Sequence, residues 1–84
     1  MKRNEIFEVI KSNMVVVLPN VDCDQIELDG KMSDYGADSL QIVEIVSRSM
    51  REMRIRIPRT ELVKAQNLHD LVDLFAITGK TQSG

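Results

Sequence analysis

The sequence predicts one all-α domain of three principal helices and one short helix, with a long first loop. Three segments repeat apolar residues at spacings of three and four, the period of a helix that packs on one face. Proline, asparagine or glycine stands at the ends of these segments. The one strict polar–apolar alternation covers residues 54–57 and ends at Pro58, so it is too short for an independent strand.

The first helix is expected from about Asn4 to Leu18, and Pro19 stops it. Its inward face is expected to consist of Ile6, Ile10, Met14 and Val17. Residues 19–38 form a long polar connection, which in so small a domain needs anchors in the core or a function of its own. The expected anchors are Val21, Ile26, Leu28 and Met32.

The second helix is expected from Ser39 to Met53. Its buried stripe is expected to consist of Val43, Val46, Met50 and Met53, with Ile42 beside them. Leu40 falls at the margin of this stripe, so its side chain is either part of the core or partly exposed for docking.

The C-terminal third begins with an extended linker that buries Ile55 and Ile57. A short helix is expected at about Arg59–Ala65, with Leu62 and Val63 facing the core. Asn67 is expected to cap the final helix, and it stands three residues before Asp70 as in a capping box.

Gly79 is expected to end this last helix. The single domain spans 1–84, with an ordered bundle over about 4–76 and a flexible tail over 77–84.

Charge is distributed unevenly along the chain, although the formal net charge is only −2. Residues 19–47 contain seven acids and one base, whereas residues 48–64 contain six bases and two acids. This polarity predicts a partner surface that is also polarised. Nucleic-acid binding is disfavoured, because aromatic residues are scarce and the basic run adjoins an acidic one.

The sequence offers little support for catalysis or for a metal site. Cys23 and His69 are the only residues of their types, so neither a disulfide nor a His/Cys metal cluster is expected. Asp22 and Asp24 begin like a calcium loop, but Ile26 stands where a third ligand belongs. A hydrolase would need a base beside its nucleophile. No catalytic residue and no metal site are therefore predicted, and the lone thiol suits the reducing cytoplasm.

The segment Gly36-Ala37-Asp38-Ser39-Leu40 predicts a turn that leads into a helix. Glycine can adopt the positive φ of such a turn, and Asp38 is a good N-cap. Ser39 then lies at the first turn of the helix, where a phosphate ester would be stabilised by the helix end.

These residues resemble the Asp-Ser-Leu attachment motif of the acyl carrier proteins. Val43-Glu44-Ile45-Val46 and Ile55-Arg56-Ile57-Pro58 also match that family, so the resemblance extends from about Asn4 to Phe75. It implies a four-helix acyl-carrier bundle. It also implies that a phosphopantetheinyl transferase attaches 4′-phosphopantetheine to Ser39 and that the arm holds an acyl group as a thioester. The chain would then be a carrier and not an enzyme; the alternative from another class is a small helical interaction module.

Within this family the chain looks similar to freestanding polyketide carriers of β-branching cassettes. Such carriers donate acetyl to an enzyme similar to hydroxymethylglutaryl-CoA (HMG-CoA) synthase. Gln41 stands where fatty-acid carriers usually have an acid, and arginines follow where they have acidic or neutral residues. The residues expected to contact partners are Leu40, Gln41, Glu44, Arg48 and Arg51. The chain is expected to be a cytoplasmic monomer without membrane or nucleic-acid partners. A general fatty-acid or other polyketide carrier is the alternative function.

Overall fold

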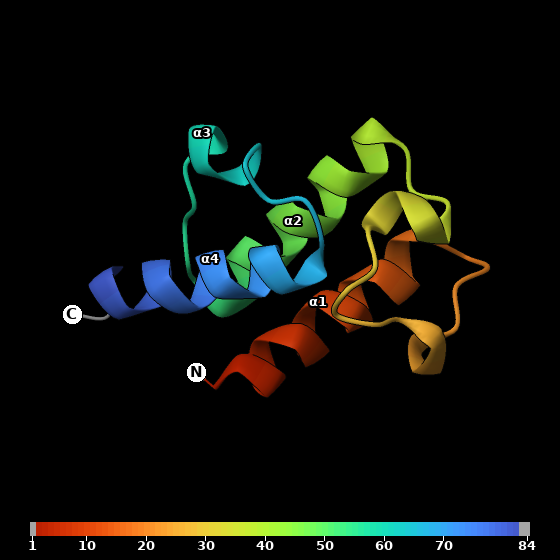
Figure 1. Ribbon diagram of the computed structural model, residues 1–84, viewed down its shortest axis with the longest axis horizontal. Coiled ribbons are helices and arrows are strands. Elements are labelled where there is room, and N and C mark those ends of the chain that lie inside the picture. Colours follow the sequence, from red (N-terminus) through yellow and green to blue (C-terminus); the bar gives the residue numbers. More distant parts are fainter. Residues whose placement is uncertain (1, 83–84) are drawn as a thin grey trace.

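The structure, a computed structural model, describes residues 2–82 and is helical throughout its regular elements (Figure 1). The all-α prediction is confirmed, since four α-helices and two single 3₁₀ turns account for the regular structure of these residues. The elements are α1 (Arg3–Val17), η1 (Cys23–Gln25), η2 (Met32–Tyr35), α2 (Ser39–Met53), α3 (Arg59–Leu62) and α4 (Leu68–Gln82).

The core lies where α1 packs against α2 and α4 (Figure 1). Apolar residues at helical spacing on each helix meet there, which is why an isolated amphipathic pattern becomes a stable helix in this chain. The short helix α3 contacts α4 and contributes little to this centre. The most deeply buried apolar side chains are Ile6, Ile10, Met14, Ile45, Leu68 and Phe75.

The buried face of α2 differs from the expected stripe. Val43 is 54% exposed, whereas Ile45 and Ser49 are fully buried. The small Ser49 side chain faces α1, and its hydroxyl donates to the Ile45 carbonyl at 2.8 Å. Because α2 has apolar residues on more than one face, periodicity alone did not show which face α1 would cover. The remaining members of the expected stripe are buried or packed against the core: Ile42, Val46, Met50 and Met53.

A buried polar cluster, which the sequence pattern did not predict, joins α1 to α2. The Asn13 amide nitrogen lies 2.9 Å from the Val9 carbonyl and 3.3 Å from the Ser49 hydroxyl. The Arg48 Nε donates to the Asn13 side-chain oxygen at 3.4 Å. Hydrogen bonding offsets the cost of burying these groups and fixes the position of α1 along α2.

Both side-chain packing and backbone hydrogen bonds hold the long first loop against the rest of the domain. Ile26 and Met32 are buried, as expected, and Val21 packs against the core. Leu28 was expected to be an anchor, but its side chain is exposed. Its carbonyl instead accepts the His69 N–H at 2.8 Å, and the Gly30 carbonyl accepts the Leu68 N–H at 2.9 Å. The loop thus satisfies two free N–H groups at the start of α4.

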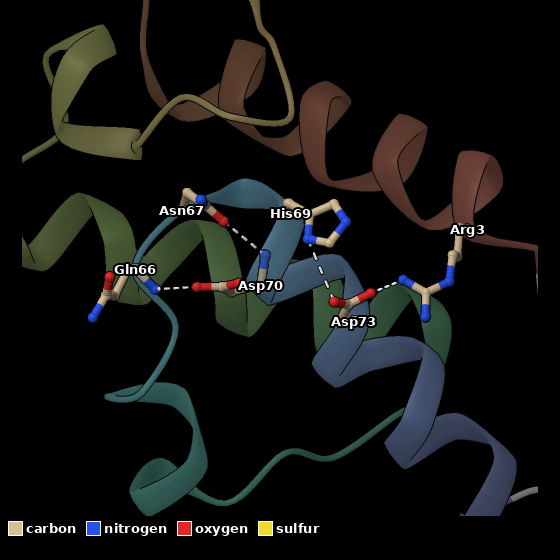
Figure 2. Close-up of polar contacts among 6 residues, drawn as sticks. All are labelled: Arg3, Gln66, Asn67, His69, Asp70 and Asp73. Atoms are coloured by element: carbon tan, nitrogen blue, oxygen red, sulfur yellow. Dashed lines mark hydrogen bonds and ion pairs between the residues drawn. The ribbon is translucent and has the colours of Figure 1, made fainter.

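The start of α4 carries the expected cap. The Asp70 N–H donates to the Asn67 side-chain oxygen at 2.8 Å, and the Asp70 carboxylate accepts the Gln66 N–H at 3.0 Å (Figure 2). An ion pair between Arg3 and Asp73 then ties α4 to the first turn of α1 (Figure 2).

The C-terminal boundaries correct three expectations. The short helix ends at Leu62 and not at Ala65, and Val63 is exposed instead of facing the core. Helix α4 does not stop at Gly79 but continues to Gln82, so residues 77–82 are not a separate tail; residues 83–84 lie outside the described part. A Cβ at position 79 would lie 3.0 Å from Ile55 Cδ1. Glycine there makes room for Ile55 and does not end the helix.

Candidate functional site

The turn before α2 fixes the direction in which Ser39 enters the helix. Gly36 has φ 90° and ψ 9°, the left-handed conformation that was expected of it. A Cβ there would meet nothing within 4 Å, so the backbone angle and not the space requires glycine. Ala37 is buried beneath the turn, and its N–H donates to the Met32 carbonyl at 3.3 Å. The turn is therefore anchored in the core immediately before the exposed Asp38 and Ser39.

Asp38 and Gln41 form a reciprocal capping box at the start of α2. The Gln41 N–H donates to the Asp38 carboxylate at 2.8 Å, and the Asp38 N–H donates to the Gln41 side-chain oxygen at 3.0 Å. The predicted N-cap is confirmed. Gln41 was expected to contact partners; the structure shows it half-buried, with its side chain engaged in the cap. The glutamine side chain therefore closes the cap.

Ser39 is the first residue of α2 and is exposed. Within residues 2–82 no hydrogen bond links its hydroxyl to a potential general base. The carboxylate of Asp38 accepts the Gln41 N–H, and His69 lies on α4 with its Nδ1 3.4 Å from the Asp73 carboxylate (Figure 2). The arrangement presents a hydroxyl at a helix N-terminus without a group that could activate it.

Apolar surface surrounds the start of α2. Leu40 was expected to be either part of the core or partly exposed. Its side chain is 82% exposed and therefore accessible. An adjacent groove of about 560 Å³ runs between α2, α3 and the start of α4. Most of its walls are apolar, and they include Ile42, Val46, Met50, Ile57, Leu62 and Leu71.

The charged candidates on α2 do not form one continuous surface. Glu44 and Arg51 are exposed. Arg48 is half-buried and donates to Asn13 of α1, so it is part of the helix–helix contact. Arg48 therefore lies at the helix–helix contact, whereas Arg51, three residues later in the sequence, is accessible.

One cluster of potential metal ligands was not predicted from the sequence. His69, Asp70 and Asp73 have ligand atoms within 4.8 Å of one another on α4 (Figure 2). Their spacing of one and four positions on a helix was a signal that could have revealed them. Both carboxylates are already engaged, however, because Asp73 pairs with Arg3 and Asp70 accepts the Gln66 N–H. We read the cluster as part of the polar contacts that hold the start of α4.

The structure thus combines a small helical bundle with an exposed serine at the start of a helix and an apolar groove nearby. In the comparison with protein families, residues 12–75 match the family described as "Phosphopantetheine attachment site". The chain belongs to this family of acyl carrier proteins, whose cofactor is 4′-phosphopantetheine. Acyl carrier proteins are carriers and not enzymes, so the prediction that the chain is not an enzyme is confirmed.

Three relatives illustrate the similarity. The "Polyketide biosynthesis acyl-carrier-protein AcpK" of Bacillus subtilis is 32% identical over 75 residues, which cover 89% of this chain and 92% of that protein. An acyl carrier protein of Campylobacter concisus is 33% identical over 76 residues, with coverage of 89% and 97%. One of Akkermansia muciniphila is 37% identical over 73 residues, with coverage of 86% and 90%. Membership implies that a phosphopantetheinyl transferase and synthase enzymes act on the chain.

Among the helices that the structure describes, none combines the length and the apolar character that crossing a membrane requires.

Proposed function

We propose that Ser39 is the attachment residue for the arm and that the chain presents an acyl group to polyketide enzymes. The observation that carries the proposal is the Asp38–Gln41 capping box, which holds Ser39 exposed at the first position of α2. A phosphodiester on its Oγ would lie beside the free N–H groups and the positive end of the helix dipole. When bound, 4′-phosphopantetheine supplies the thiol that holds the acyl group.

The residues around Ser39 have two tasks in this proposal. The groove between α2 and α3 offers apolar walls that can exclude water from an acyl chain. Leu40 and Val43, exposed on the first turns of α2, offer apolar contact area to an enzyme that receives the cargo. Glu44 and Arg51 add charges of opposite sign along the same helix, which would set the orientation of that enzyme.

Donation of acetyl to an HMG-CoA-synthase-like enzyme is the specific role that we favour. Its support is the similarity to a relative whose name places it in polyketide biosynthesis, together with the basic run over residues 48–64. A general fatty-acid or other polyketide carrier is the second candidate, favoured by the similarity to proteins named simply acyl carrier protein. We place the reaction in the cytoplasm, because a lone thiol such as Cys23 suits a reducing compartment.

Incubation with coenzyme A, Mg²⁺ and a broad-specificity phosphopantetheinyl transferase is expected to add one phosphopantetheinyl group per chain. Intact-mass spectrometry measures the gain directly. Omission of coenzyme A is the control, and the mass should then stay unchanged. If the complete reaction leaves the mass unchanged, the chain is a helical interaction module and the proposal is wrong.

The acetyl-loaded chain is expected to transfer its acetyl group to an HMG-CoA-synthase-like enzyme of a β-branching cassette. We expect kcat/KM to fall about tenfold in Leu40→Ala, since truncating a central apolar interface residue costs more than about 1 kcal/mol and about 1.4 kcal/mol corresponds to tenfold. Val16→Ala is the matched control, because Val16 is also exposed and apolar but lies on α1. If a fatty-acid ketosynthase accepts the wild-type chain with the same kcat/KM, the general carrier function is supported instead. If Leu40→Ala and Val16→Ala lower kcat/KM equally, Leu40 is not part of the docking surface.

A further inference from the structure

The C-terminal end of α2 borders a hollow of about 640 Å³ with a basic rim. Its apolar part comes from Met50, which is half-buried, and Ile55, which is buried. Arg51, Arg54 and Arg56 are exposed around it, and no acid is among the described residues that line it. The hollow therefore combines an apolar floor with three positive charges.

Arg54 adopts a backbone conformation that disfavours any residue with a Cβ. Its φ is 57° and its ψ is 38°, and it is the one non-glycine residue with positive φ in the described chain. Helices commonly end with glycine in this conformation. The Met50 carbonyl accepts the N–H groups of both Arg54 and Ile55, bonds that a glycine at position 54 would preserve. The backbone thus does not explain the arginine, and such strain is concentrated at functional positions.

Among the residues that the structure describes, neither Arg51 nor Arg54 has its guanidinium ion-paired with an acid. Arg48 provides the contrast, since its Nε donates to Asn13 at the α1–α2 contact. Two accessible arginines therefore point to a negative group from outside the domain.

We propose that this basic hollow binds an acidic segment of the enzyme that receives the cargo, an inference that rests on the proposed carrier function. Carboxylates pair with guanidinium groups through two parallel hydrogen bonds, and the methylene stem of a glutamate can cover Met50 and Ile55. A nucleic-acid backbone is a poorer occupant, because the chain has a pI of about 5.3 and residues 19–47 contain seven acids.

The hollow lies at the opposite end of α2 from Ser39. A 15-residue helix is about 20 Å long, so an acidic segment bound there leaves the hydroxyl and its arm accessible. Two contacts about 20 Å apart would fix how α2 lies on the enzyme, which a single contact near Ser39 would not do.

The test uses the full 84-residue chain and an acetylated, amidated hexaglutamate peptide as the probe. In ¹⁵N-NMR titrations we expect the largest shifts at residues 47–56. Arg54→Gly and Arg51→Gln are each expected to raise the dissociation constant about fivefold, the upper range for one exposed ion pair. Arg54→Gly should nevertheless unfold at the same or a higher urea concentration, because glycine relieves the left-handed conformation.

Lys64→Gln is the matched control, since it removes the same charge from a side chain that is 70% exposed and outside the hollow; its dissociation constant should stay within twofold of that of the wild type. Unchanged binding by Arg54→Gly overturns the inference, and so does a lower unfolding midpoint, which would make Arg54 a structural residue. Equal binding of hexaglutamine, or complete competition by inorganic phosphate, also overturns it. The peptide needs neither arm nor transferase, so a failure of loading and a failure of this inference are separate results.

Discussion

A Ser39→Ala variant is expected to gain no mass with coenzyme A and a phosphopantetheinyl transferase, whereas the wild-type chain gains one phosphopantetheinyl group. The phosphodiester forms on the serine Oγ, and alanine has no atom to replace it. Alanine is a strong helix former, and the Asp38–Gln41 bonds use no atom of Ser39. The variant should therefore keep its helical circular dichroism and lose only the modification, which intact-mass spectrometry measures.

Two other serines serve as controls for this prediction. Ser33→Ala changes the turn that precedes the site, and Ser47→Ala changes α2 two turns beyond it. Both variants should gain the same mass as the wild type. If Ser39→Ala still gains the group, the arm is attached elsewhere. The roles proposed for the capping box and for the start of α2 would then be wrong.

A Phe75→Ala variant is expected to lose about 3–5 kcal/mol of unfolding free energy, which is most of the stability of a domain this small. Phe75 is 0% exposed on α4 and belongs to the core cluster that α1, α2 and α4 share. Truncation leaves a cavity that the surrounding helices can close only in part. The measurement is urea unfolding followed by circular dichroism at 222 nm.

Ile77→Ala provides the comparison on the same helix. Ile77 is 61% exposed, so its truncation should change the unfolding free energy by less than about 0.5 kcal/mol. A similar loss in both variants would show that burial of the Phe75 ring in the core does not account for the loss. A loss below about 1 kcal/mol in Phe75→Ala would show that the core collapses around the missing ring.

The proposed docking surface and the core use different residues of α2. The first two turns present Ser39, Leu40 and Glu44 to the outside, whereas Ile45 and Ser49 are buried. This division lets one helix contribute to the core and still expose side chains near its start and near its end. The apolar excess that made its buried face ambiguous is, on this view, part of its interaction surface.

Local interactions determined what the sequence predicted correctly. The positive φ of Gly36, the cap at Asp38 and the start of α2 at Ser39 all depend on residues within a few positions of one another. The attachment motif is such a local feature, so the carrier family could be inferred from the sequence. The family comparison confirms it.

Only the tertiary structure decided which face of α2 is buried and where the helices end. Asn13 selects the buried face of α2 through a contact 36 residues away in the sequence, and the same cluster removes Arg48 from the accessible surface. Gly79 lies within a helix because Ile55 packs beside it, and Arg54 takes a conformation that its residue type disfavours. These features depend on neighbours that the folded chain brings together. Periodicity and propensity describe one segment at a time and therefore do not contain them.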